Sequence, residues 1–211
     1  MVDENLIKKI SEKVVQRMER EKKPIIANIS NRHVHLTAQD LETLFGSGYK
    51  LNKDRDLMQP GEFATREFVI ISGPKGKIEK VRVLGPVRKQ TQVEISRTDS
   101  FVLGVDAPVR LSGDLAGSAP ISVMGPQGRI DLKEGCIVAK RHVHMTPKDA
   151  QEYEVKDHDI VKIKAGIGGP RGTIFDDVII RVREDMALEC HIDVDEGNAC
   201  FLKNGDKVII L

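Results

Sequence analysis

Four of the six histidines lie in two identical His-Val-His tripeptides, and histidines at this spacing can bind a metal ion. The segments NRHVHLTAQD and KRHVHMTPKD, 109 residues apart, share the arginine, both histidines, the threonine and the aspartate. In a β-strand, residues i and i+2 point to the same side, so His33 and His35 present their imidazoles together, as do His142 and His144. Two such imidazoles can chelate one divalent metal ion at about 2.0–2.1 Å.

Each half of the chain also offers one later residue of a metal-ligand type. At an offset of 97 residues, QVEISRTDS aligns with ECHIDVDEG, and Glu94 falls on His191. Both residues have apolar neighbours in sequence, so strand alternation takes them off the core face. Three donors leave open coordination positions, as in a catalytic site, and this donor set suits zinc, although cobalt, manganese or iron would also fit. The predicted ligand sets are His33, His35 and Glu94, and His142, His144 and His191.

Duplication decides between metal binding and a simpler interpretation. A single His-x-His is more often a hydrogen-bonded surface or boundary pair than a metal site. Two copies, each with a ligand-type residue at an equivalent later position, favour metal binding. His158 has no counterpart in the other half and is interpreted as an ordinary surface residue. The cysteines Cys136, Cys190 and Cys200 are interpreted as small buried residues.

Short strands with turn residues at their ends dominate most of the chain, including FVIISG, KIEKVRVLG, TQVEIS, DVIIRVR and KVIIL. Strands this short and frequent favour barrels or sandwiches over a parallel βαβ sheet. The sequence predicts a mainly β fold with two small β-barrel domains related by an internal repeat, short capping α-helices and an N-terminal amphipathic helix. The predicted ranges are 1–20 for this helix, 21–31 with 140–211 for one barrel, and 32–139 for the other.

Helix and turn signals position the repeated motifs. A stripe at helical spacing is formed by Leu6, Ile7, Ile10, Val14 and Met18. Thr37 and Thr146, each followed three residues later by an aspartate, predict helix starts directly after each His-Val-His strand. Three GPxG segments, which begin at Gly73, Gly125 and Gly169, are typical of tight turns between strands. Because PIIAN precedes the first motif as EGCIVAK precedes the second, we expect the early strand to be shared with the C-terminal half.

Composition excludes several classes of protein. The 211 residues are 40% hydrophobic and 31% charged, and 33 basic against 32 acidic residues leave a net charge of +1. No overall field therefore attracts nucleic acid or a membrane surface. The chain lacks an apolar run of about 20 residues and a secretory signal, and an odd number of cysteines argues against a disulfide framework. We expect a cytoplasmic protein with no nucleic-acid or membrane partner.

A basic segment, GPKGKIEKVRVLGPVRKQTQVEIS, lies between the first His-Val-His and the end of the Glu94 strand. Lys77 and Lys80 are interpreted as the solvated face of a hairpin. Arg88 follows a Gly-Pro turn six residues before Glu94, so its guanidinium can lie near the metal ligands as a fork for a phosphate oxyanion.

The chain closely resembles the PduL family of phosphate propanoyltransferases. The segments that carry this resemblance are HVHLT, GPKGKIEKVRVLGPVRKQTQVEISRTD and the second RHVHM. The resemblance extends from about Pro24 to the C-terminus. It implies two β-barrel domains, a two-metal site between them holding two divalent ions such as zinc, and Arg88 as the phosphate ligand. The residues that it implies along the coenzyme A path are Ile29, Ser30, Asn31, Lys75, Arg82 and Asn198.

The resemblance implies the interconversion of acyl-CoA, either propanoyl-CoA or acetyl-CoA, plus phosphate with acyl phosphate plus coenzyme A. The sequence has no nucleophile elbow and no convincing Cys–His pair, so we expect direct transfer without an acyl-enzyme. A link to bacterial microcompartments and propanediol degradation is also implied, since related proteins carry a short amphipathic segment that directs encapsulation. Residues 1–20 would serve such contacts with shell or core proteins, or pack on their own barrel or a second subunit. A homo-oligomer is expected.

Three other classes of protein remain open at this stage. A cupin-type metalloprotein uses His-x-His on a β-barrel, but Gln39 stands where its later glutamate is usual. A metal hydrolase of the amidohydrolase type places His-x-His at a strand end, but its barrel typically needs about 250 residues. A zinc-stabilised scaffold protein of a microcompartment is the third alternative.

Overall fold

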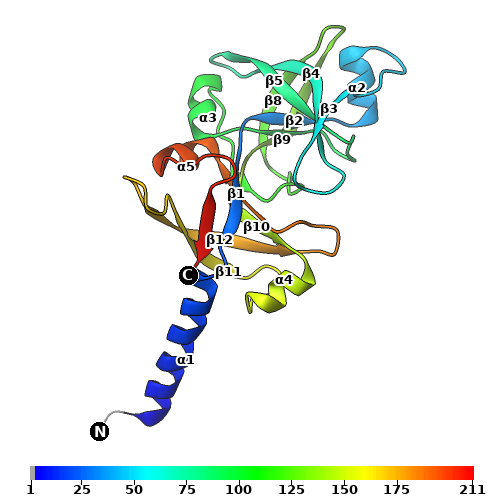
Figure 1. Cartoon of the computed structure of the whole chain (residues 1–211). Coiled ribbons are helices and arrows are strands. Elements are labelled where there is room, and N and C mark those ends of the chain that lie inside the picture. Colours follow the sequence, from blue (N-terminus) through cyan, green and yellow to red (C-terminus); the bar gives the residue numbers. More distant parts are fainter. Residues whose placement is uncertain (1–2) are drawn as a thin grey trace. The chain divides into compact units, whose positions relative to one another are not determined.

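The computed structural model describes residues 3–211, which divide into two compact units (Figure 1). The central unit contains Ser30–Lys140 and Asp193–Asp195. The interleaved unit contains the chain up to Ile29 together with Arg141–Ile192 and Glu196–Leu211. Within the described part of the chain, no helix has both the length and the apolar character that a membrane crossing requires.

Six strands of the central unit close into a β-barrel. Around the barrel the order is β2 (His33–His35), β5 (Lys77–Gly85), β4 (Phe63–Ser72), β8 (Ala119–Met124), β9 (Arg129–Ala139) and β6 (Gln92–Glu94), which returns to β2. Beside this barrel, β3 (Lys53–Asp56) pairs with β4 and β7 (Val109–Arg110) pairs with β9. The helices of this unit are α2 (Ala38–Phe45) and α3 (Arg97–Leu103).

Six strands also close the barrel of the interleaved unit. Their order is β1 (Ile25–Ser30), β13 (Glu189–Asp193), β10 (His142–Met145), β12 (Thr173–Val182), β11 (Ile160–Ala165) and β14 (Lys207–Ile210). β1 pairs antiparallel with β14, with Ile25 opposite Val208, so the early strand completes a barrel made otherwise by the C-terminal half. Around this barrel lie α1 (Glu4–Glu21), α4 (Pro147–Glu152) and α5 (Val194–Ala199). The mainly β prediction, with short helices, is therefore confirmed.

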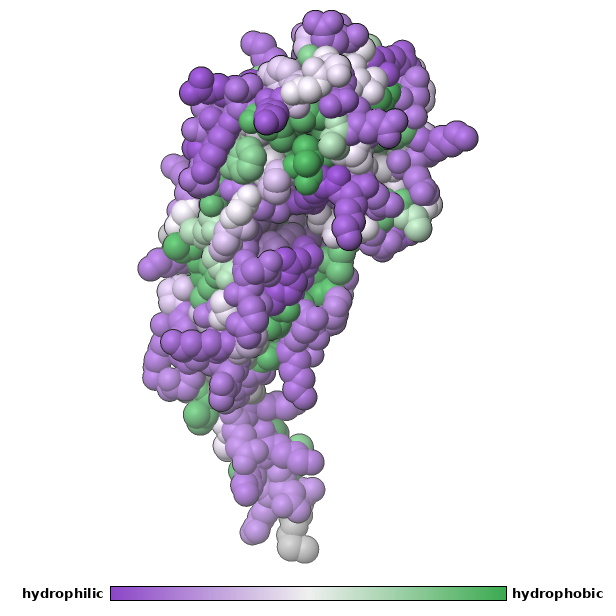
Figure 2. Space-filling view, turned by 90° about the vertical axis from the view of Figure 1, so that its right-hand side faces the viewer, coloured by the Kyte–Doolittle hydropathy of each residue, from purple (hydrophilic) through white to green (hydrophobic). Residues whose placement is uncertain are grey.

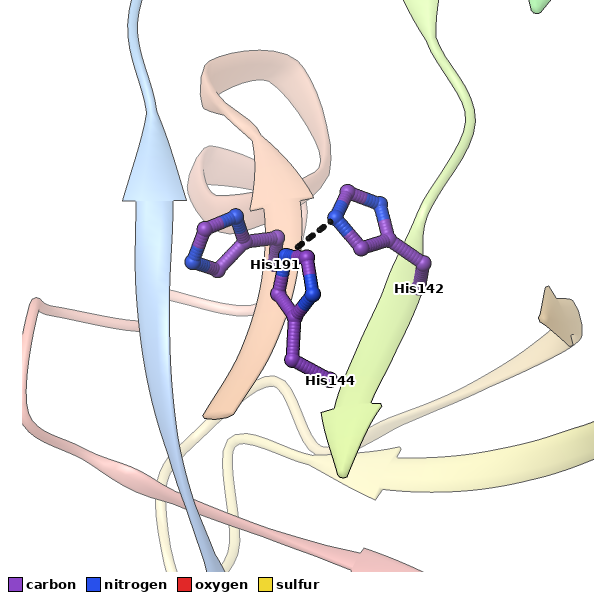
Figure 3. A group of neighbouring side chains, drawn as sticks. All are labelled: His142, His144 and His191. Atoms are coloured by element: carbon purple, nitrogen blue, oxygen red, sulfur yellow. Dashed lines mark hydrogen bonds between the residues drawn. The ribbon is translucent and has the colours of Figure 1, made fainter. Parts of the chain in front are cut away.

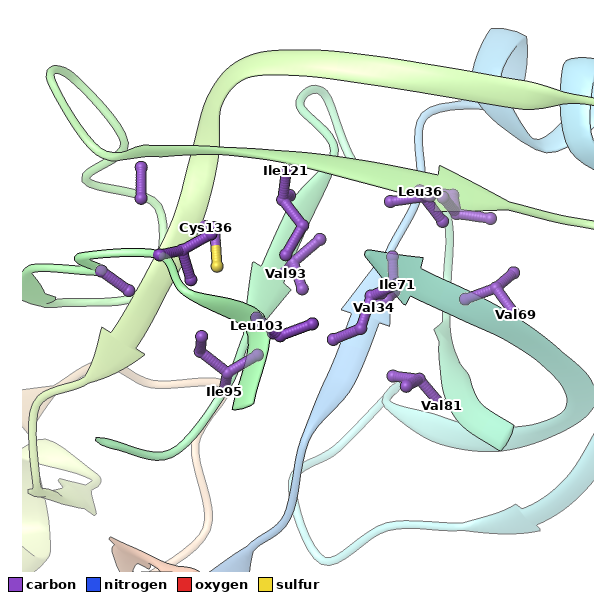
Figure 4. Close-up of a cluster of buried hydrophobic side chains, with 14 of the residues drawn as sticks. Val34, Leu36, Val69, Ile71, Val81, Val93, Ile95, Leu103, Ile121 and Cys136 are labelled. Carbon is purple, nitrogen blue, oxygen red and sulfur yellow. The ribbon is translucent and has the colours of Figure 1, made fainter. Parts of the chain in front are cut away.

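Each barrel encloses a separate apolar core. In the central unit, inward-facing strand residues such as Val34, Ile71 and Val93 are fully buried among each other (Figure 4). Val143 is the corresponding buried residue of the other barrel. The middle valine of each His-Val-His thus fixes its strand to a core, which holds both flanking histidines on the opposite side. On the face shown in Figure 2, hydrophilic residues cover most of the surface and hydrophobic ones form small patches.

Two of the predicted helices begin at the predicted caps. The Thr37 hydroxyl accepts a hydrogen bond from the backbone N–H of Asp40 at 3.0 Å, and Thr146 accepts one from Asp149 at 3.2 Å. The Asp149 carboxylate in turn accepts from the backbone N–H of Thr146 at 2.9 Å, which completes a capping box. These caps end the His-Val-His strands sharply, because each strand passes into a helix within two or three residues.

The C-terminal end of α1 is anchored to the interleaved barrel. Nε of Arg20 donates to the Tyr153 carbonyl at 2.9 Å, and the Tyr153 hydroxyl donates to the Lys23 carbonyl at 2.8 Å. The apolar stripe of the helix is about half exposed along its length. The amphipathic helix was predicted correctly, but its apolar face is not buried in a core.

The GPxG segments form different turns. The backbone N–H of Gly73 donates to the Gly76 carbonyl, and that of Gly125 donates to the Gly128 carbonyl, each at 2.9 Å. These turns connect β4 with β5 and β8 with β9. In the third copy, the N–H of Gly169 donates instead to the Gly166 carbonyl at 3.0 Å, so this turn starts three residues earlier in the longer loop between β11 and β12.

Candidate active site

Strand pairing brings the first predicted ligand group together. β2 and β6 are antiparallel neighbours, with His33 opposite Glu94 and His35 opposite Gln92. The ligand atoms of His33, His35 and Glu94 all lie within 4.8 Å of one another, and the three side chains are buried. Nε2 of His33 is 3.5 Å from the Glu94 carboxylate, while its Nδ1 is 2.8 Å from the Asn31 carbonyl. Because only a protonated Nδ1 can donate to that carbonyl, the lone pair of Nε2 faces the group.

The second group repeats this geometry in the interleaved unit. β10 and β13 are antiparallel neighbours, with His142 opposite His191 and His144 opposite Glu189. Figure 3 shows the rings of His142 and His144 from one strand beside that of His191 from the next. Nε2 of His142 and Nε2 of His144 are 3.0 Å apart, and the ligand atoms of all three histidines lie within 4.8 Å. Three imidazole nitrogens therefore converge on one small volume.

Electrostatics keeps two of these imidazoles neutral. Burial, with the neighbouring His33 and Arg88, holds the pKa of His35 well below its usual value. Burial, with His142 and His191, lowers the pKa of His144 to about 2. Burial also disfavours the charged form of His33, but the Glu94 carboxylate and the Asn31 carbonyl together outweigh that effect and raise its pKa. A neutral imidazole keeps the lone pair that a metal ion needs.

The donor sets fit divalent metal ions. Two imidazoles plus a carboxylate, and three imidazoles, are combinations typical of zinc, and three protein donors leave a position for substrate. Nδ1 of His35 is buried without a hydrogen bond of good geometry to any residue within 3–211.

Arg88 lies in the connection between β5 and β6 and is tied to the first group through a polar chain. Its guanidinium donates to the Glu62 carboxylate at 2.8 Å and to the Ser112 hydroxyl at 3.1 Å. The same hydroxyl accepts from the Gln92 amide at 2.8 Å, and that amide also donates to Glu94. The chain of hydrogen bonds from Arg88 through Ser112 and Gln92 thus reaches Glu94, and the positive charge of Arg88 lowers the pKa of His35.

Two of the predicted coenzyme A residues lie next to the first group. Asn31 holds His33 through its carbonyl, and Arg82 on β5 is opposite His33 in the parallel pairing with β2. The Arg82 guanidinium is 3.6 Å from Asp54 and lies over the Phe68 ring at 4.4 Å from its centroid. These contacts hold the Arg82 side chain against the outer face of the barrel.

The other predicted coenzyme A residues occupy three places. Ser30 is the last residue of β1, directly before Asn31. Lys75 is exposed in the turn between β4 and β5, where its backbone N–H donates to the Leu103 carbonyl at 3.0 Å. In the interleaved unit, the Ile29 side chain packs against Gly197 of α5, next to the exposed Asn198.

Sequence reasoning missed four polar residues around the two groups. Gln92 and Glu189 lie two positions before Glu94 and His191, and strand alternation could have placed them on the ligand face. Glu62 and Ser112 come from loops and reach Arg88 only through the tertiary fold, so no local pattern indicates them.

Comparison with known proteins identifies the class of chemistry. A family model described as phosphate propanoyltransferase matches residues 26–203. The chain is 56% identical over 211 residues to a phosphate propanoyltransferase of Thermotoga maritima, covering 100% of this chain and 99% of that one. It is 49% identical over 202 residues to one of Clostridioides difficile (96% and 95% covered), and 51% identical over 176 residues to one of Listeria monocytogenes (83% and 82% covered).

The double-barrel protein is therefore an enzyme of the acyltransferase class. More narrowly, the chain belongs to the phosphate propanoyltransferase family. Membership of this family favours phosphate-dependent acyl transfer over the cupin, hydrolase and scaffold alternatives.

Proposed function

We propose that this protein interconverts acyl-CoA and phosphate with acyl phosphate and coenzyme A by direct transfer, using propanoyl-CoA or acetyl-CoA. The observation that carries the proposal is the repeated convergence of three ligand atoms within 4.8 Å, with Arg88 beside one of the two groups. In this proposal His33, His35 and Glu94 hold one divalent ion, and His142, His144 and His191 hold the other. When bound, such ions stabilise negative charge on a carbonyl oxygen or a departing thiolate, and zinc suits sulfur.

Arg88 binds phosphate in this proposal. A guanidinium has five N–H donors, more than the two that Glu62 and Ser112 accept, and its planar fork matches two phosphate oxygens. Because Glu62 and Ser112 already hold the guanidinium, little side-chain entropy is lost when phosphate binds. The bound phosphate is then oriented toward the reacting carbonyl.

In the transfer itself, a phosphate oxygen attacks the thioester carbonyl carbon and the carbon–sulfur bond breaks. The acyl group is then bonded to phosphate, and sulfur departs as the thiolate of coenzyme A. An acyl-cysteine intermediate is disfavoured, because burial raises the pKa of the Cys136 thiol to about 12 and raises that of Cys190 further. Both thiols therefore stay protonated and weakly nucleophilic.

Coenzyme A needs positive charge for its phosphates and a path to the reacting carbonyl. We assign this role to Lys75 and Arg82, with Ile29, Ser30, Asn31 and Asn198 as further contacts. The strand register that places Arg82 opposite His33 supports this assignment.

The deciding assay follows the thioester absorbance of propanoyl-CoA and acetyl-CoA with and without phosphate. We expect phosphate-dependent loss of absorbance that a chelator abolishes and added zinc restores. His35→Ala should remove the activity, whereas the exposed His158→Ala should retain it. Equal thioester loss without phosphate would indicate a hydrolase, and a trapped acylated protein would refute direct transfer.

We further propose that α1 makes the contacts implied for residues 1–20, with microcompartment shell or core proteins or with another copy of the chain. The half-exposed stripe from Leu6 to Met18 supports this proposal. Deleting residues 1–20 should abolish co-purification with shell proteins or lower the oligomeric state measured by light scattering. If neither changes, α1 has no such role; Met1 and Val2 lie outside the described residues.

A further inference from the structure

We propose that Glu189 is a positioning residue for His191, with Asn28 as the group that holds Glu189. The carboxylate fixes the imidazole so that Nδ1, rather than Nε2, donates to a metal ion. This inference rests on the proposed metal role of His142, His144 and His191.

The contacts of Glu189 define this role. Its Oε2 is 2.9 Å from Nε2 of His191, and its Oε1 accepts from the Asn28 amide at 2.5 Å. Glu189 and His191 lie on the same side of β13, since they are two residues apart, and Asn28 comes from β1. The carboxylate is 3% exposed, so both of its oxygens are fixed by protein groups rather than by bulk water.

This arrangement determines which ring nitrogen is available. A carboxylate oxygen can only accept, so Nε2 of His191 carries the proton that it donates to Glu189. The lone pair of the imidazole then resides on Nδ1. A carboxylate behind a ligating histidine also makes the imidazole a better donor, and loss of such a partner typically costs about 10- to 100-fold in metal affinity.

The internal repeat supports the assignment independently. In the central unit, Gln92 lies two residues before Glu94 and opposite the second histidine of its motif, and Glu189 has the same position relative to His191 and His144. The Gln92 amide donates to the Glu94 carboxylate. Each barrel thus places a buried polar residue behind its third ligand, an N–H donor behind an acid and an acceptor behind an imidazole. The residue type at this position therefore matches the ligand beside it: Gln92 can donate to Glu94, and Glu189 can accept from His191.

Burial of Glu189 also argues against a merely structural role. A buried carboxylate costs free energy unless it is paired, and Glu189 lies on the ligand side of β13, whereas Cys190 and Ile192 face the apolar core. β1 and β13 are already joined as hydrogen-bonded neighbours in the barrel, so the Asn28 contact is not needed to hold them together. The contact with Nε2 of His191 is the one that concerns metal binding.

Glu189→Gln tests the inference, because it keeps the shape of the side chain but removes the charge. Zinc affinity is measured by competition with a chromophoric chelator in full-length protein, and again in a His35→Ala background that weakens the first group. We expect the affinity of the second group to fall about 10- to 100-fold. Asn28→Ala, which frees the carboxylate from its clamp, should cause a smaller loss.

Glu67→Gln is the matched control. Glu67 is also a buried carboxylate that accepts from an asparagine amide, that of Asn52 at 2.7 Å, but it belongs to neither histidine group. It should lower stability without changing zinc affinity. Cobalt substitution gives a second measurement, since the intensity of the visible absorption reports coordination number. Glu189→Gln should keep the wild-type intensity once cobalt saturates the site.

The outcomes separate this inference from the proposed function. The proposed metal site is wrong if His142→Ala binds as much zinc as the wild-type protein does. If wild type binds it and Glu189→Gln binds it within twofold as tightly, the positioning role is wrong. A changed cobalt intensity would make Glu189 a ligand itself, and an equal loss of affinity in Glu67→Gln would make the effect one of stability; either result overturns the inference.

Discussion

Arg88→Ala removes the guanidinium to which the proposed mechanism assigns phosphate. The variant leaves the backbone of the β5–β6 connection in place, because the N–H of residue 88 still donates to the Leu36 carbonyl, at 2.8 Å in the native protein. It also leaves in place the hydrogen bond that the Gln92 amide donates to Glu94. The main loss should therefore fall on phosphate binding and not on metal content.

The magnitude follows from the fork geometry. Hydrogen bonds to charged groups contribute about 1.5–3 kcal/mol each. The Arg88 side chain is 29% exposed, so we take the lower value for each of two bonds to phosphate. The sum of about 3 kcal/mol corresponds to about a 100-fold loss in kcat/KM for phosphate. Arg88→Lys keeps the charge but not the fork, and we expect about a 10-fold loss.

The assay is initial-rate thioester loss at varied phosphate, with zinc content measured on the same samples. Arg129→Ala serves as a control, because Arg129 makes an exposed ion pair with Asp131 outside both ligand groups, and it should behave as wild type. Arg88→Ala also leaves Glu62 without its arginine partner, so the Glu62 carboxylate would repel phosphate. Adding Glu62→Gln to Arg88→Ala should therefore restore part of the loss.

Unchanged kcat and unchanged KM for phosphate in Arg88→Ala would refute the assignment. A parallel loss of zinc and activity would show instead that Arg88 acts through the ligand group.

Two further predictions concern stability. A Cβ on Gly125 would lie 2.5 Å from the Leu44 carbonyl oxygen, so Gly125→Ala should lower the free energy of unfolding by about 1–3 kcal/mol in urea titrations; an unchanged midpoint would contradict this close packing. Burial, with Asp149 and Glu152, raises the pKa of Tyr153 to about 12, so the neutral phenol favours the folded state. Its contribution should be complete below the unfolded pKa of about 10 and disappear as the pH rises towards 12. When the pH is raised, tyrosinate absorbance should show a late ionisation step that Tyr153→Phe removes. If Tyr153→Phe removes the earlier step instead, the raised pKa does not belong to Tyr153.

The grouping of the six proposed ligands was predictable because strand geometry is local. Alternation places His33 and His35 on one side, and the 97-residue offset aligned Glu94 with His191. In the structure Glu94 lies opposite His33 and His191 lies opposite His142, so the sequence repeat is also a repeat of strand register. The exposed position of His158 and the burial of all three cysteines were predicted for similarly local reasons.

Several elements were missed where the local pattern was weak or ambiguous. β3 has the sequence KDRD and is exposed along its length, so it lacks apolar alternation. α3 begins with a capping box between Ser96 and Asp99, but these residues directly follow a strand and were not recognised as a helix start. The Glu62–Arg88 pair joins residues 26 positions apart that no periodicity connects.

The pairing of β1 with β14 has a consequence for biosynthesis. Ser30–Lys140 is a continuous segment that carries all six strands of its barrel, so this barrel can close while the ribosome is still translating the C-terminal half. The other barrel cannot close until Val208 has been made and has met Ile25. The entropy cost of closing this barrel therefore comes late in translation, because the two partners of β1, β13 and β14, are the last strands to be made. Truncation near the C-terminus should therefore leave the central barrel folded and the three-histidine group unformed.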